Sequence, residues 1–231
     1  YQIAMGGLEP DSIAFPLRKS VRGKSCYFRM ANVQQILSEQ NTVVTSEGNI
    51  KYDHLIIATG SKSNFFGNAA LEKNSLTLKS IPGALDIRSW IFQNLEQAVF
   101  EKKLTEFLTI VIVGGGPTGV EIAGALADLR KHVLPKDYPE LQFSRFKIVI
   151  IEGSEKVLNA MSDHASAHAT RYLKEMGVEV KTKQLVKDFD GSEVLLSTGE
   201  KIPTNILIWS AGVLGNPVEG IVEDSLSKNQ R

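Results

Sequence analysis

The sequence has almost no cysteine, and this limits the chemistry that it can support. Cys26 is the single cysteine among 231 residues, so an internal disulfide, a Cys-x-x-Cys pair or a Cys/His cluster for zinc or iron–sulfur is excluded. A reducing, cytoplasmic setting fits such a chain best. Cys26 itself lies in a β-like pattern, where we expect a small core residue.

The sequence also lacks a surplus of either charge and any long apolar run. Lys plus Arg and Asp plus Glu number 26 each, so no overall field attracts nucleic acid, and we expect none as a partner. No apolar stretch approaches the roughly 18 residues that a membrane-spanning helix needs. No basic stretch leads into an apolar one at the start, as it does in an export signal. We therefore expect a chain that does not cross a membrane.

The pattern of apolar residues predicts an α/β protein in which strands and helices alternate after residue 108. A strand is expected over 109–113, a helix over 118–133, a second strand over 147–151 and a second helix over 162–176. This alternation predicts a doubly wound parallel sheet. Four shorter strand-like runs follow and predict an antiparallel flap beside that sheet: 178–182, 185–190, 193–198 and 205–212.

The first hundred residues are less regular. Short β-like runs between residues 26 and 60 predict a small meander that leads into one buried strand, Leu55 to Ala58, which ends at Thr59-Gly60. A polar crossover follows. A helix is then expected after Pro82-Gly83, because apolar residues recur at helical spacing from Leu85 to Val99.

A glycine-rich loop joins the strand over 109–113 to the next helix. Its residues are Gly114, Gly115, Gly116, Pro117, Thr118 and Gly119. The G-x-G-x-x-G spacing is a weak signal by itself. Here it follows a strand and opens a helix, as in dinucleotide-binding folds, whereas the kinase glycine loop joins two strands. The plain structural alternative is a tight strand-to-helix turn.

Each glycine of the loop has an expected purpose if a dinucleotide binds there. Gly114 permits a tight turn, Gly116 leaves room for a pyrophosphate, and Gly119 lets helix and strand pack closely. The start of the helix adds N–H donors and a partial positive charge that attract the anion. We therefore interpret the loop as a dinucleotide-binding site.

An acid at the end of the next strand is the usual companion of such a loop. Glu152 occupies this place, where it would accept hydrogen bonds from the ribose hydroxyls. Its separation from Gly119 exceeds the usual interval of about 20 residues, and the excess lies in an inserted loop over 132–146. An acid here would repel a 2′-phosphate, and only Lys156 follows it. NADH is therefore expected rather than NADPH.

Two further features have simple structural explanations. Glu121 is expected in the first turn of the helix, where a carboxylate complements the helix dipole. His164 and His168 stand four residues apart, a spacing that can ligate zinc on a helix. The catalytic version needs Glu after the first His, where this chain has Ala165, so a solvated helix face is the favoured interpretation.

Several stretches together resemble a known group of flavoproteins. They are GGGPTGVEIAGAL, YDHLIIATGS, VIIEGSEKVL and ILIWSAGVLG. Together they resemble the pyridine nucleotide–disulfide oxidoreductase superfamily, whose members have two dinucleotide domains. Two further stretches resemble one group within this superfamily, the type II NADH:quinone oxidoreductases. They are the opening YQIAMGGLEPDSIAFPLR and the insert LPKDYPEL.

This resemblance implies that two cofactors act one after the other. Hydride passes from NADH to FAD, and the electrons then reduce a membrane quinone. Glu121 is given a positioning role near the nicotinamide and the flavin. Thr59 and Gly60 are placed beside FAD, and Ala211 and Gly212 beside the nicotinamide.

The resemblance also implies a domain order. Residues 109–213 form a Rossmann-like NADH-binding domain with its antiparallel flap, 1–108 are part of an FAD-binding domain with a crossover, and 214–231 begin the return to that domain. The family's FAD glycine fingerprint, its later flavin segment and its membrane-docking helices are not in this sequence. We therefore expect a fragment with an incomplete FAD site, inactive alone, from a protein peripheral to the cytoplasmic face of the inner membrane.

Two other functions remain open. A related NADH-dependent reductase of ferredoxin or nitrite type would share these motifs, and a non-catalytic NADH sensor would need only the glycine loop and Glu152. Glu121 separates catalysis from sensing, because only hydride transfer requires a posed nicotinamide. The oligomeric state is also open, a homodimer included.

Overall fold

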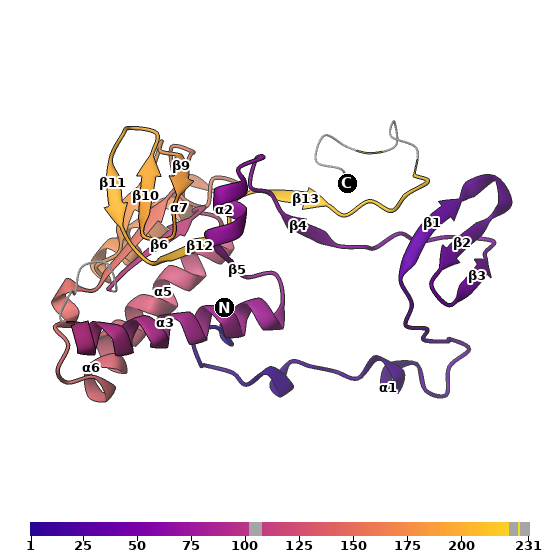
Figure 1. Ribbon diagram of the computed structural model, residues 1–231, viewed down its shortest axis with the longest axis horizontal. Helices are drawn as coiled ribbons and strands as arrows, with labels where there is room; N and C mark the ends of the chain where they lie inside the picture. The colour runs from indigo at the N-terminus through magenta and orange to yellow at the C-terminus, as the bar shows by residue number, and fades with distance from the viewer. Residues whose placement is uncertain (102–107, 222–225, 227–231) are drawn as a thin grey trace. The chain divides into compact units, whose positions relative to one another are not determined.

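The computed structural model describes residues 1–101, 108–221 and 226 and divides into two compact units (Figure 1). The first unit comprises Tyr1–Pro10 and Ser63–Gly212, and the second comprises Asp11–Lys62 and the described part of Val213–Arg231. The glycine loop and Glu152 both belong to the first unit.

A five-stranded parallel sheet lies at the centre of the first unit. Its strands are, in spatial order, β5 (Leu76–Thr77), β12 (Ile206–Trp209), β6 (Thr109–Val113), β7 (Lys147–Ile151) and β8 (Glu179–Lys181). Both faces are covered, which explains why the central strands are almost continuously apolar. The strand order reverses at β6, because β7 and β8 follow on one side and β12 lies on the other. Ligands of such sheets bind beyond the carboxyl ends of the strands at this switch point.

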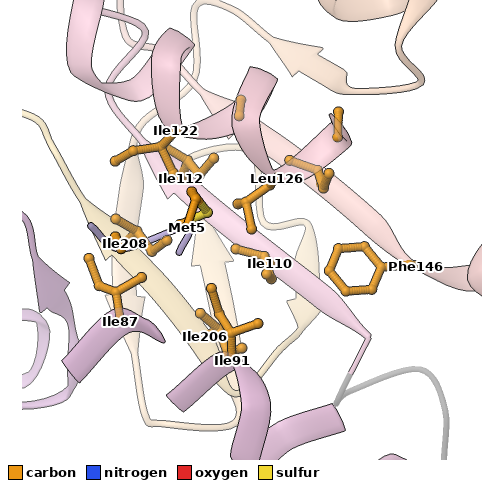
Figure 2. Packing of buried hydrophobic residues seen from close by; sticks show 14 of the residues in the cluster. Met5, Ile87, Ile91, Ile110, Ile112, Ile122, Leu126, Phe146, Ile206 and Ile208 are labelled. Carbon is orange, nitrogen blue, oxygen red and sulfur yellow. The ribbon is translucent and has the colours of Figure 1, made fainter. Parts of the chain in front are cut away.

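Three helices cover one face of the sheet. They are α3 (Ile81–Glu101), α5 (Pro117–His132) and α7 (Asp163–Glu175). Alternate strand residues face these helices because side chains alternate between the two faces of a strand. Figure 2 shows this packing, with the following residues in one cluster: Ile87, Ile91, Ile110, Ile112, Ile122, Leu126, Ile206 and Ile208. Met5, from the start of the chain, is buried in the same cluster.

The opposite face is covered by a second, antiparallel sheet and a short helix. The sheet consists of β9 (Val186–Phe189), β10 (Glu193–Leu196) and β11 (Lys201–Pro203), and the helix is α2 (Ala69–Asn74). The intervening strand residues pack against it: Val111, Val113, Val149, Ile151, Leu207 and Trp209. Of the four runs predicted for the flap, 185–190 and 193–198 form β9 and β10 of this sheet, whereas 178–182 and 205–212 form β8 and β12, which pair in parallel in the central sheet. The α/β fold is confirmed.

Most predicted elements of the first unit are confirmed, but two expectations change. The domain boundary at 109 separates elements that pack together, because α2, β5 and α3 belong to the same compact unit as β6. The inserted loop over 132–146 contains α6 (Leu134–Asp137) and η3 (Phe143–Arg145). It is anchored by apolar side chains that are buried in the helix-side core: Leu134, Leu141 and Phe146.

The second unit contains the predicted meander. Its strands are β1 (Val33–Leu37), β2 (Thr42–Thr45) and β3 (Gly48–Lys51), all antiparallel. The short elements of this region and its borders are η1 (Pro10–Ser12), α1 (Leu17–Val21), η2 (Ser38–Gln40), β4 (Ser61–Ser63) and β13 (Val213–Gly215), and β4 pairs with β13.

Two predictions in this unit are wrong. Leu55 to Ala58 form no strand, and Ile56 is 90% exposed. A parallel strand needs neighbours to satisfy its backbone, and no segment in the described part of the chain pairs with this one. Cys26 is exposed rather than buried, because the β-like run around it likewise forms no strand before Val33.

Candidate dinucleotide-binding site

The glycine loop lies at the carboxyl end of β6, at the switch point of the sheet. Gly114 has φ +104°, in the left-handed region that favours glycine. Its N–H donates to the carbonyl of Ile151 at the end of β7 (2.8 Å). A Cβ on Gly114 would lie 2.9 Å from the nitrogen of Ala211, beyond the end of β12. The loop therefore touches the ends of both neighbouring strands and has no room for a side chain at this position.

Gly119 and Gly116 have opposite surroundings. A Cβ on Gly119 would lie 1.9 Å from the carbonyl oxygen of Gly114, so a side chain would push α5 away from the loop. A Cβ on Gly116 would meet no atom within 4 Å, and its φ of −72° suits any residue. Neither the backbone nor the packing of the protein requires glycine at 116. Because Gly116 has no side chain, the space at the start of α5 stays open, and a group bound at the helix start would occupy this space.

The start of α5 presents hydrogen-bond donors to this space. Gly116 is the N-cap and supplies no side-chain cap, and Pro117 has no N–H. The first backbone bond to the cap runs from the N–H of Val120 to the carbonyl of Gly116 (3.0 Å). The N–H groups of Thr118 and Gly119 precede this bond and point out of the helix, where the helix dipole is positive. An anion such as a diphosphate suits this arrangement.

Glu152 follows β7 directly and contacts the loop. Its carboxylate accepts hydrogen bonds from the N–H groups of Gly115 (2.6 Å) and Ser154 (2.7 Å), one on each oxygen. The carbonyl of Gly115 accepts in turn from the N–H of Leu158 (2.7 Å). Because each carboxylate oxygen has two lone pairs, Glu152 keeps acceptor capacity for ribose hydroxyls while it holds the loop.

The segment after β12 closes the other side of the loop. The hydroxyl of Ser210 donates to the carbonyls of Val113 (2.8 Å) and Gly114 (3.1 Å). Sequence analysis missed Ser210; the signal for it was a polar residue placed immediately after an apolar strand at the switch point. Ala211 is half-buried beside the loop, and Gly212 has φ +67° with Phe66 against it. The structure thus brings the predicted residues Ala211 and Gly114 together.

Glu121 lies elsewhere in the helix than expected. The first turn of α5 contains no acid, and Glu121 is its fifth residue, in the second turn. Its side chain is exposed and makes no hydrogen bond or ion pair with the described residues. It therefore caps nothing, and the helix-start explanation fails.

Thr59 and Gly60 belong to the second unit. The Thr59 hydroxyl donates to the carbonyl of Asn216 (2.6 Å), and Gly60 has φ +73°. This hydrogen bond joins the segment that contains Thr59 to the segment after β13. Both residues are exposed.

Other candidate sites are not supported. No group of three or more His, Cys, Asp or Glu side chains in the described part of the chain could hold a metal ion. The rings of His164 and His168 lie next to each other on α7, tilted by 45°. A cavity of about 740 Å³ lies between the carboxyl-terminal ends of α5 and α7. Arg130 lines it, but donates to the carbonyls of Phe146 and Gly177, and burial lowers its pKa. None of the residues that line this cavity belongs to the glycine loop.

Among the described residues, no helix is both long and apolar enough to cross a membrane.

Comparison with known proteins identifies the family. The model of the pyridine nucleotide-disulphide oxidoreductase family matches residues 9–228. The chain belongs to this family. The resemblance of its motifs to the family's motifs is thereby confirmed, and the family's dinucleotide-binding fold is the one observed.

Similar members of the family are NADH dehydrogenases. A probable NADH dehydrogenase from Dictyostelium discoideum is 32% identical over 226 residues, which are 93% of this chain and 50% of that protein. The type II NADH:quinone oxidoreductase Ndh of Mycobacterium tuberculosis is 30% identical over 225 residues, 92% of this chain and 49% of that protein. The structure of NDH2 from Plasmodium falciparum in complex with NADH superposes with a TM-score of 0.83 at 26% identity and covers 93% of this chain and 47% of that one. The chain spans about half the length of the curated relatives it matches.

Proposed function

We propose that this chain carries the NADH-binding part of a type II NADH:quinone oxidoreductase. The observation that carries the proposal is the open space at Gly116, which adjoins the donors of α5 and lies in the same loop that Glu152 contacts. The similarity to NADH dehydrogenases, and to an NDH2 structure that contains NADH, supports the same choice. The relatives give no such support to the ferredoxin- and nitrite-reductase alternatives.

NADH would be held mainly by backbone groups. The N–H groups of Thr118 and Gly119 would bind the diphosphate, and the Glu152 carboxylate would accept from ribose hydroxyls. Ala211 and Gly212 would border the nicotinamide. Glu121 would orient the nicotinamide through its unpaired carboxylate, which also favours catalysis over a sensing role.

The residues present do not form a complete site for FAD. The single G-x-G-x-x-G of the sequence is the one assigned to NADH, and only Thr59 and Gly60 are proposed beside the flavin. In the family, FAD accepts the hydride and passes electrons on. We therefore assign to the chain itself the binding and orientation of NADH, and no complete turnover.

For the full-length protein, the proposal names a quinone as the acceptor. It also places the protein peripherally on the cytoplasmic face of the inner membrane, attached through segments outside this sequence. A homodimer is part of the proposal, and light scattering of the full-length protein measures it.

Calorimetric titration of the chain with NADH tests the proposal. One NADH per chain is expected, with weaker binding of NADPH. Absence of binding by both nucleotides would contradict the assignment. In the full-length protein, NADH oxidation coupled to a quinone, and not to a ferredoxin, would separate the leading function from its nearest alternative.

A further inference from the structure

Lysines lie in the two backbone segments next to Glu152, the residue expected to reject NADPH. The segments 153–158 and 181–184 run beside each other at the end of β7. Backbone bonds hold them there, from the N–H of Lys183 to the carbonyl of Ser154 (2.9 Å) and from the N–H of Glu152 to the carbonyl of Lys181 (2.9 Å). The two segments contain three lysines between them: Lys156, Lys181 and Lys183. A 2′-phosphate next to Glu152 would therefore have positive partners within the same two segments.

Each of these lysines is already paired with a carboxylate. Lys156 contacts Asp163, and Lys183 contacts Glu155 at 2.6 Å. Lys181 is held between two acids, Glu179 (3.0 Å) and Glu200 (2.9 Å). These four pairs involve every lysine of the two segments.

The pairs differ in how easily they could be opened. Lys181 is only 18% exposed and doubly paired, so it is fixed on β8. The lysine of the Lys183–Glu155 pair is largely exposed, and that of the Lys156–Asp163 pair is about one-third exposed. Both have long flexible stems, and each lysine lowers the pKa of its acid, through a hydrogen bond and through charge.

We propose that Glu155 and Asp163 are specificity-determining residues: by pairing with Lys183 and Lys156, they withhold these two cations from a 2′-phosphate and so favour NADH over NADPH. The inference rests on the proposed NADH site and adds to it a second source of discrimination besides Glu152. An acid at 152 repels the phosphate, and acids at 155 and 163 occupy the partners that would otherwise compensate.

The test is to release the lysines without touching the binding site. Glu155→Gln and Asp163→Asn each keep the shape of the side chain and remove its charge. Glu193→Gln is the matched control, because it frees Lys201 from a pair of the same 2.6 Å length on the antiparallel sheet and adds the same net charge. Calorimetric titration of each variant with NADH and with NADPH, at low and at high salt, gives the selectivity directly.

We expect each single variant to bind NADPH about two- to threefold more tightly and the double variant about four- to tenfold, which is the scale of exposed ion pairs. NADH affinity should stay within about twofold, and the gain should vanish at high salt because exposed charges are screened. An unchanged NADPH-to-NADH ratio with normal NADH binding, or an equal gain in Glu193→Gln, would overturn this inference alone. Loss of NADH binding in the unaltered chain would overturn the proposed function, and this inference with it.

Discussion

The carboxylate of Glu152 accepts a hydrogen bond from the backbone N–H of Gly115 at 2.6 Å. This contact ties the glycine loop after β6 to the end of β7. One side chain therefore has two tasks, since it holds the loop in shape and also presents acceptors to a ribose. Strand β7 places this side chain at the loop, because Glu152 is the first residue after the strand ends, and its backbone N–H is held by the carbonyl of Lys181 (2.9 Å).

Replacing Glu152 with Gln tests both tasks. The amide can accept on one atom only, so the bond to Gly115 or the bond to Ser154 is lost, and charge repulsion of a 2′-phosphate disappears. We expect NADH affinity to fall about three- to tenfold and the preference for NADH over NADPH to narrow. Titration calorimetry with both nucleotides measures this, with Glu175→Gln on α7 as the control. An unchanged ratio of the two affinities would count against Glu152 as the discriminating acid.

Alanine at Gly116 and at Gly119 should have different effects. At 116 the new methyl group enters open space, so NADH affinity should fall at least about tenfold while the free energy of unfolding changes by about 1 kcal/mol or less. At 119 it meets the Gly114 carbonyl, so unfolding should become easier by about 1–3 kcal/mol. Gly124→Ala, also in open space on α5, is the control and should preserve binding. Undiminished NADH binding by Gly116→Ala would show that the space is not used.

Glu121→Gln addresses orientation of the nicotinamide in the full-length flavoprotein. Because Glu121 is exposed and unpaired within the described residues, the substitution removes no structural contact. We expect NADH affinity within about twofold of the original and a rate of flavin reduction lower by about tenfold or more, the scale of a lost charged hydrogen bond. Stopped-flow absorbance of the flavin gives this rate. Equal rates in the two proteins would remove Glu121 from the mechanism.

Tyr138, in the insertion, should contribute to stability in a way that depends on pH. Burial and its hydrogen bond to Glu96 (2.9 Å) raise the pKa of Tyr138 from 10.0 to about 12. The unfolded chain releases this proton at lower pH than the folded one, so the contribution is complete below pH 10.0 and is lost as pH rises through about 12.

Tyr138→Phe measures that contribution. Urea denaturation at neutral pH should show a loss of about 0.5–1.5 kcal/mol, the value of one hydrogen bond. Above pH 10.0 the variant should lose less stability than the original protein as pH rises. Parallel declines in the two proteins would show that Tyr138 titrates normally.

The sequence predicted the secondary structure around the glycine loop well, because local patterns determine it. The strand over 109–113, the glycine loop and the start of α5 follow from neighbouring residues, and their bounds agree with the structure within one residue. The contact between Gly114 and Ala211 was not predictable in this way, because it depends on β12 pairing with β6 from almost a hundred residues away.

The predictions that were wrong concern structure that depends on residues far away in the sequence. Leu55 to Ala58 have strand composition, but a strand exists only when a neighbour pairs with it, and composition carries no information about that neighbour. Burial of Met5 depends on α3, α5 and the sheet together, so the glycine-rich opening of the chain gave no sign of it. Asp163 and Glu155 were unremarkable as residues, and only the structure shows which lysines they hold.

Amide chemical shifts of the isotope-labelled chain, followed during titration with NADH, test the central claim most directly. If the diphosphate lies at the start of α5, the amide signals of Gly116, Thr118 and Gly119 should show the largest changes, and in Gly116→Ala the changes should require at least about tenfold more NADH. Changes centred instead on the cavity between the carboxyl-terminal ends of α5 and α7, with these three amides unmoved, would contradict the account.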